Sequence, residues 1–171
     1  KSRRDSYRAA VAELEASYRA NDDRVEGRVG IGDLLVALGR SDEAEAAYRS
    51  ALALDASAVP AAVNLADLYR RRGDEAQAEA VLREALARSP DNSAVEYTLA
   101  LSLIRQGRKS EALALLASAA KSTPVRADIV YTYAVALADI GRRDEAIDVL
   151  EANLVPSRGS RDVLLALVAF H

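Results

Sequence analysis

The chain contains 171 residues, half of them apolar and 29% of them charged, with a formal net charge of -3. The near balance of 23 basic and 26 acidic residues argues against a nucleic-acid surface, and no apolar run reaches the roughly 18 residues of a membrane span. The lack of Cys and the single His, His171, exclude disulfides and thiolate metal sites and argue against a His-based catalytic or metal site.

An internal period of 34 residues runs through the chain. It is marked by four glycines, Gly39, Gly73, Gly107 and Gly141. Alanine follows five residues after each glycine, and Gly or Ala stands seven residues before it. Leu or Tyr stands four residues before each glycine. A register kept through four units predicts a repeat fold.

The register divides the chain into units in order. Residues 1–24 are predicted to form the second helix of a truncated repeat, because the pattern counted back from Gly39 continues through them. Four complete repeats follow, at 25–58, 59–92, 93–126 and 127–160, and residues 161–171 predict the first helix of a truncated fifth repeat. All of them are expected to form one continuous solenoid domain. Since the chain begins and ends within a repeat and has no Met, we expect it to be a fragment of a longer protein.

Each repeat is predicted to form two antiparallel helices. In 59–92 the first helix ends at Gly73, where a left-handed backbone is least costly for Gly. Asp74 and Glu75 then begin the second helix, where negative charge complements the helix dipole. Small residues such as Ala66 and Ala78 let the two helices approach closely. The sequence therefore predicts an all-α fold.

The residues at these positions resemble the tetratricopeptide repeat. Repeat 59–92 carries the family pattern as Leu65, Ala66, Tyr69, Gly73, Ala78, Leu82, Ala85 and Pro90. The Trp common early in such repeats is replaced by Arg28, Ala62, Glu96 and Val130. The resemblance covers almost the whole chain and implies a right-handed superhelical solenoid of four repeats with flanking half-repeats.

A second likeness concerns the last part of the chain. The stretches Tyr131 to Leu137 and Arg161 to Leu167 are similar to the C-terminal repeats of some bacterial multihaem c-type cytochromes. The likeness would make the chain the non-catalytic arm of a redox or other enzyme, in the periplasm rather than the cytoplasm. Haem attachment needs a Cys motif that this chain lacks, so no cofactor is expected within it.

No catalytic site is expected. The segment Gly30-Ile31-Gly32 is too short for a phosphate-binding loop. Acidic pairs such as Asp42-Glu43 recur at helix starts, where capping and solvation explain them. Ser and Thr residues have no His partner for a hydrolytic triad. The sequence therefore favours a binding module over an enzyme.

The first helices of a solenoid line its concave groove. Positions are counted from the first residue of each repeat. Helical geometry predicts that positions 4, 7, 8 and 11 face the core and that positions 2, 5, 6, 9, 12 and 13 face the groove. The candidate ligand contacts are Asp33, Asn64, Asp67, Arg71, Tyr97, Leu101, Arg105, Tyr131 and Val135.

These side chains suit different parts of a ligand. Tyr97 and Tyr131 offer flat apolar surface with a hydroxyl, and Arg71 and Arg105 suit an acidic group. Asn64 suits a peptide backbone, while Asp33 and Asp67 favour a basic residue. In the alternative interpretation, the tyrosines pack between adjacent repeats and the arginines complement the helix dipole.

The predicted function is binding of a peptide or protein segment, with no nucleic acid as partner. The alternative is a structural or oligomerisation arm of a larger protein. The C-terminal helix, Val163 to Phe170, is apolar nearly all round. We therefore expect Leu164, Leu167, Val168 or Phe170 to mediate self-association.

Overall fold

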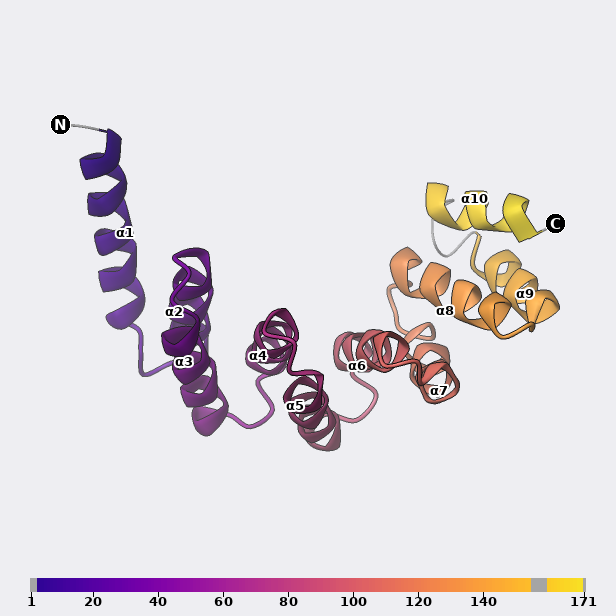
Figure 1. Cartoon of the computed structure of the whole chain (residues 1–171), viewed down its shortest axis with the longest axis horizontal. Coiled ribbons are helices and arrows are strands. Elements are labelled where there is room, and N and C mark those ends of the chain that lie inside the picture. The colour runs from indigo at the N-terminus through magenta and orange to yellow at the C-terminus, as the bar shows by residue number, and fades with distance from the viewer. Residues whose placement is uncertain (1–2, 155–159, 171) are drawn as a thin grey trace. The chain divides into compact units, whose positions relative to one another are not determined.

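A computed structural model describes residues 3–154 and 160–170 of the chain, and His171 lies outside these ranges. Within them the chain forms ten α-helices and no strand (Figure 1). The predicted all-α class is therefore confirmed. The helices fall into two compact units, residues 1–89 (unit 1) and 90–171 (unit 2), and each unit is described by itself.

Unit 1 holds the first five helices. They are α1 (Arg3–Arg19), α2 (Val25–Ala37), α3 (Ser41–Leu54), α4 (Val59–Arg71) and α5 (Glu75–Arg88). Helices α2 and α3 form one hairpin and α4 and α5 form the next (Figure 1). Helix α3 packs against α4, and α1 packs against α2.

Unit 2 holds the other five helices. They are α6 (Ser93–Arg105), α7 (Lys109–Ala119), α8 (Ala127–Asp139), α9 (Arg143–Asn153) and α10 (Arg161–Phe170). The hairpins here are α6 with α7 and α8 with α9, and α7 packs against α8. Helix α10 packs against both α8 and α9. The first helix of each repeat begins at residue 25, 59, 93, 127 or 161. The spacing between these starts equals the period of the sequence pattern.

Each hairpin turns at the glycine of the pattern. Gly73 has a φ of 79°, which an L side chain rarely adopts, and the three counterpart glycines are also in the left-handed region. The amide of Gly73 donates to the carbonyl of Arg70 at 3.0 Å, and the amide of Asp74 donates to the carbonyl of Tyr69 at 2.9 Å. These bonds satisfy carbonyls at the end of α4.

The core is wider than the predicted stripe. Positions 4, 7 and 8 are buried in α4 as Ala62, Leu65 and Ala66. Positions 3 and 10, which were not assigned to the core, are buried as well, for example as Ile129 and Ala136 in α8. A first helix packs both on its own second helix and on the preceding second helix, as α8 does on α9 and α7, so a broader arc is covered.

Candidate functional site

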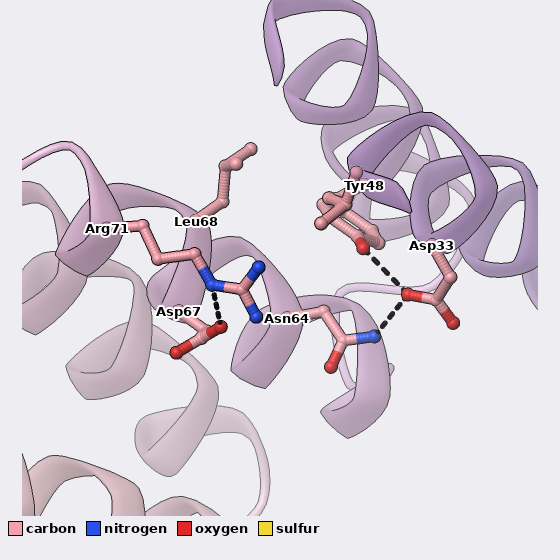
Figure 2. A pocket seen from close by; sticks show the side chains of 7 residues that line it. Asp33, Tyr48, Asn64, Asp67, Leu68 and Arg71 are labelled. Atoms are coloured by element: carbon pink, nitrogen blue, oxygen red, sulfur yellow. Dashed lines mark hydrogen bonds and ion pairs between the residues drawn. The ribbon is translucent and has the colours of Figure 1, made fainter. Parts of the chain in front are cut away.

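Unit 1 contains a hollow of about 250 Å³ where α2, α3 and α4 meet (Figure 2). Four of the residues predicted to contact a ligand line it together. The lining residues are Asp33, Val36, Tyr48, Asn64, Asp67, Leu68 and Arg71. These three helices thus bring carboxylate, amide, hydroxyl and guanidinium groups to one place.

Asp33 is the centre of a network that joins the three helices. Its Oδ1 accepts a hydrogen bond from the Tyr48 hydroxyl at 2.7 Å and another from Asn64 Nδ2 at 2.8 Å (Figure 2). Burial, together with the hydrogen bond to Asp33, raises the pKa of Tyr48. The Tyr48 hydroxyl therefore stays protonated and donates a hydrogen bond to the Asp33 carboxylate.

The position of Tyr48 depends on a glycine in the facing helix. The Tyr48 side chain is 2% exposed and its ring lies against Gly32 of α2. A Cβ at Gly32 would collide with this ring. Gly32, predicted as a small residue at the helix crossing, thus leaves space for the Tyr48 ring. In this position the Tyr48 hydroxyl lies in the hollow.

Asp67 and two arginines form the other side of the hollow. Arg71 Nε lies 2.7 Å from Asp67 Oδ2, and Arg70 Nε donates to Asp67 Oδ1 at 2.9 Å. Burial alone would raise the pKa of Asp67, but the hydrogen bond from Arg70 and the charges of both arginines lower it. The guanidinium group of Arg71 lies between Asp67 and Asn64 (Figure 2).

A larger hollow of about 770 Å³ lies beside this one in unit 1, and Asp33 lines both. Its walls come from α1, α2 and the segment leading into α4, and include Tyr18, Val29 and Pro60. The Tyr18 ring packs directly on Gly30, where a Cβ would collide with it. The absence of a side chain at Gly30 therefore lets α1 pack closely on α2.

In unit 2 the candidate tyrosines have different surroundings. Tyr97 is half-buried, with the Arg126 guanidinium 5.4 Å from its ring centroid and its hydroxyl 3.2 Å from Thr132 Oγ1. Arg126 also pairs with Asp128 at 2.6 Å. Tyr97 therefore contributes to packing as well as to surface.

Tyr131 is 40% exposed and lines a hollow of about 290 Å³ between α8 and α10. The other lining residues are Val135, Asp162, Leu165, Ala166, Ala169 and Phe170. Of the remaining candidates, Leu101 is half-buried and Arg105 is exposed on α6. This hollow is mostly apolar, in contrast to the smaller hollow of unit 1.

Sequence reasoning did not assign Tyr48, Arg126 or Leu165 to a site. Tyr48 occupies a core position of a second helix, and its hydroxyl joins the site through its hydrogen bond to Asp33. Arg126 precedes α8 and therefore lies outside the helical face that was searched. Leu165 occupies position 5 of α10, the position of Tyr97 and Tyr131, so extending the same count would have found it.

No described helix has the length and apolar character needed to cross a bilayer. The described ranges likewise contain no group of three or more acidic or His side chains that could hold a metal ion.

Two tetratricopeptide-repeat family models match the chain, one at residues 2–59 and 29–93 and the other at residues 69–127. The chain belongs to the tetratricopeptide-repeat family. The predicted family is thereby confirmed, and with it a fold that suggests a protein–protein interaction module. Such repeat proteins are generally non-catalytic scaffolds that bind protein or peptide partners. A comparison with curated proteins found no match.

Several solved tetratricopeptide structures are similar to this chain. YrrB, described as having an unusual peptide-binding site, is 22% identical over 92% of this chain and 81% of its own, with a TM-score of 0.68. PilF of Pseudomonas aeruginosa is 21% identical over 94% and 69%, with a TM-score of 0.71. A thermophilic protein of Thermus thermophilus is 21% identical over 96% and 90%, with a TM-score of 0.70.

At these identities the likeness shows the fold, and the predicted all-α tetratricopeptide solenoid is confirmed. The likeness to multihaem cytochromes and the exact repeat boundaries stay predictions.

Proposed function

We propose that the chain binds peptide or protein segments on its first helices, and that in unit 1 the hollow around Asn64 and Arg71 is a polar binding site. The observation that carries this proposal is the position of the Arg71 guanidinium. Its Nε pairs with Asp67, and the group lies between Asp67 and Asn64 in the hollow that all three residues line (Figure 2). An arginine held in this way presents a donor pair to an incoming group.

The donors and acceptors of the hollow suit a peptide that carries an acidic group. Asn64 Nδ2 already donates to Asp33, and no described residue donates to the Asn64 carbonyl oxygen. That oxygen can accept a hydrogen bond from a backbone N–H of the ligand. The terminal nitrogens of Arg71 can bind a carboxylate of the ligand through two hydrogen bonds.

The unit 2 hollow suits an apolar side chain. Tyr131 and Val135 supply apolar surface from α8, while Leu165 and Phe170 supply it from α10. A half-exposed tyrosine gives a large contact area with few rotatable bonds, which favours its use at binding surfaces. Leu101 and Arg105 on α6, together with Tyr97, are proposed as further contacts of the same unit.

The likeness to YrrB gives limited support to this proposal. That protein is described as having a peptide-binding site, and its likeness to this chain is one of fold. The proposal therefore rests on the chemistry of the two hollows in this chain. Because different residues line the two hollows, each hollow is tested by its own substitution.

A random-peptide library selected on the chain supplies the probe. Selected peptides are titrated against wild type, Arg71→Ala and Tyr131→Ala, with Arg88→Ala as the matched control on exposed α5 surface. Arg71→Ala should leave the fold intact, because Asp67 keeps Arg70 as a partner. We expect each groove variant to weaken binding by about tenfold, or about 1.4 kcal/mol, and the control to bind as wild type does.

Two results would contradict the proposal. The first is that no selected peptide distinguishes Arg71→Ala and Tyr131→Ala from wild type, which would put the binding surface elsewhere. The second is that Arg88→Ala weakens binding as much as Arg71→Ala does, which would show a general charge effect. Circular dichroism of each variant separates lost binding from lost folding.

A further inference from the structure

The repeat at residues 25–58 differs from the other complete repeats at the residues that meet in the unit 1 hollow. Its position 9 is Asp33, its position 24 is Tyr48, and position 6 of the helix that follows is Asn64. The other complete repeats have Leu at position 24, as Leu82, Leu116 and Leu150, and are followed by Thr98, Thr132 and Ala166 at position 6. The combination of Asp, Tyr and Asn therefore occurs once in the chain.

The helical framework does not require this combination. The three leucines at position 24 are at most 1% exposed, so Leu fills the place of Tyr48 in the other repeats. Tyr48 in turn depends on Gly32 at position 8, because a Cβ there would collide with its ring, and the other repeats have Ala at this position. Gly inside a helix is less stable than Ala. The exchange thus lowers helix stability while it places a hydroxyl in the hollow.

The Tyr48 hydroxyl holds the Asp33 carboxylate. The Tyr48 side chain is 2% exposed, and its hydroxyl donates to Asp33 Oδ1 at 2.7 Å. A ring that is packed on all sides cannot follow a moving partner. The donor is therefore fixed, and it fixes the oxygen that accepts from it.

The Asp33 carboxylate in turn orients the Asn64 amide. Asn64 Nδ2 donates to the same Oδ1 atom at 2.8 Å. A carboxylate only accepts hydrogen bonds, so the reversed amide would place two oxygens against each other. The carbonyl oxygen of Asn64 therefore lies on the side of the amide group away from Asp33 (Figure 2).

We propose that Tyr48 and Asp33 are positioning residues of the unit 1 site, which hold Asn64 as a hydrogen-bond acceptor and so select a ligand that presents an N–H there. This inference rests on the proposed function and deepens it, since it names the group that lies beside the acidic group bound by Arg71. A freely rotating asparagine would receive a donor or an acceptor equally well. The fixed asparagine presents only its oxygen and repels a second acceptor.

Backbone esters of a bound peptide test this selection. The probe is a library-selected peptide whose binding requires Arg71, synthesised with one backbone N–H at a time replaced by an ester oxygen. The replacement removes the donor and leaves the charge unchanged. At one position we expect wild type to bind the ester about tenfold more weakly than the amide. Asn64→Ala should abolish that difference, which identifies the position that contacts Asn64.

The positioning residues are then tested through the ratio of amide to ester affinity at that position. Asp33→Ala frees the Asn64 amide and should lower the ratio to about threefold or less, and Tyr48→Phe should give an intermediate ratio. Glu84→Ala removes the same charge from exposed α5 surface and should keep the wild-type ratio. Both peptides carry the same charge and are measured on the same variant. A change in stability or net charge alone therefore does not move the ratio.

The side-chain NH2 of Asn64 gives a second measurement, without a ligand. Its hydrogen bond to Asp33 should slow its hydrogen exchange with water, measured by NMR, by about fivefold or more relative to Asp33→Ala. Equal exchange in the two proteins would overturn the positioning role, whatever the peptides show.

The peptide results separate this inference from the proposed function. A ratio that stays at about tenfold in Asp33→Ala, or an ester effect that persists in Asn64→Ala, would overturn the positioning role and leave the peptide site standing. Slow exchange of Asn64 with no peptide that requires Arg71 would overturn the proposed function and this inference with it. If circular dichroism shows that Asp33→Ala is unfolded, Tyr48→Phe decides, and an unchanged ratio there overturns the inference.

Discussion

Units 1 and 2 contain the same helical hairpins but carry different side chains at two repeat positions. Position 5 is Val63 in unit 1 and Tyr131 in unit 2, and position 9 is Asp67 in unit 1 and Val135 in unit 2. The neighbouring repeat in each unit follows the same choice, with Val29 and Asp33 in one and Tyr97 and Leu101 in the other. The hairpins of the two units are alike, but position 9 is acidic in unit 1 and apolar in unit 2. The hollow of unit 1 is accordingly polar and that of unit 2 mostly apolar.

The two units also satisfy their polar groups differently. In unit 1, Asp33 draws donors from two other helices, Tyr48 of α3 and Asn64 of α4. In unit 2, the Thr98 hydroxyl donates to the carbonyl of Ala94 at 2.7 Å and the Thr132 hydroxyl donates to that of Asp128 at 2.8 Å, both within their own helix. The Asp33 carboxylate thus links three helices in unit 1, whereas these two threonines of unit 2 donate within their own helix.

The largest expected effect concerns the framework that the units share. Ala78 and Ala112 are 1% and 0% exposed at the helix crossing. Ala78→Leu and Ala112→Leu should each overpack the crossing and lower the free energy of unfolding by about 1–3 kcal/mol, with similar values in both units. Urea denaturation measures this change, and amide hydrogen exchange locates it.

Exposed alanines of the same helices provide the controls. Ala76→Leu and Ala114→Leu should change the free energy of unfolding by about 0.5 kcal/mol or less, because both sites face solvent. If a crossing variant proves as stable as its control, the crossing is misassigned. A large cost in one unit and none in the other would show that the two frameworks are not equivalent.

The second prediction sharpens the contrast between the two tyrosine hydroxyls. Tyr48→Phe removes a 2.7 Å hydrogen bond to a carboxylate from an otherwise buried side chain. Tyr97→Phe removes a 3.2 Å contact with the neutral Thr132 hydroxyl. We expect costs of about 1–2 kcal/mol and about 0.5 kcal/mol respectively, since hydrogen bonds to charged acceptors are stronger.

Thermal and urea denaturation of the two Phe variants measure these costs, with Tyr131→Phe as the control. No hydrogen bond joins the Tyr131 hydroxyl to another described residue, and that variant should match wild type in stability. Equal costs for Tyr48→Phe and Tyr97→Phe would remove the distinction between a hydrogen bond to a carboxylate and a hydrogen bond to a neutral hydroxyl.

Much of the fold could be predicted from the sequence because it depends on short-range rules. The glycine period predicted the turns, and Gly39 and Gly73 have positive φ as a left-handed C-terminal residue requires. The stripe at positions 4, 7 and 8 predicted burial of Leu65 and Leu99. Positions 3 and 10 were missed, because their burial comes from packing on the preceding second helix rather than on the partner within the repeat.

The candidate site was less predictable, because it depends on which side chains meet. Asp33, Asn64, Asp67 and Arg71 were selected from one helical face and do line one hollow. The pairing of Arg71 with Asp67 and the arrival of Tyr48 from α3 required the relative placement of three helices. In α10 the sequence showed an apolar helix, and only packing against α8 and α9 distinguishes buried Val163 from exposed Val168.

The smallest expected effect is a pH dependence that comes from Asp67 in unit 1. Burial raises the pKa of Asp67, but the hydrogen bond from Arg70 and the charges of Arg70 and Arg71 outweigh it and leave the pKa below its ordinary value. Between the folded and unfolded pKa values, the unfolded chain binds more protons than the folded chain does. The contribution is therefore complete above about pH 4, the ordinary pKa of Asp, and is lost as the pH falls through the folded pKa.

Asp67→Asn removes this contribution, and Leu101→Asn makes the matched change at position 9 of unit 2. Because Asp67 is about one third exposed, Asp67→Asn should cost only about 0.2–1 kcal/mol at neutral pH. Urea denaturation from about pH 7 to pH 3 should show the gap between Asp67→Asn and wild type narrowing below about pH 4. Leu101→Asn alters no titrating group, so its gap from wild type should stay constant. A constant gap for Asp67→Asn would mean that the ion pairs with Arg70 and Arg71 contribute nothing to stability, and the polar face of unit 1 would then depend on the Asp33 network alone.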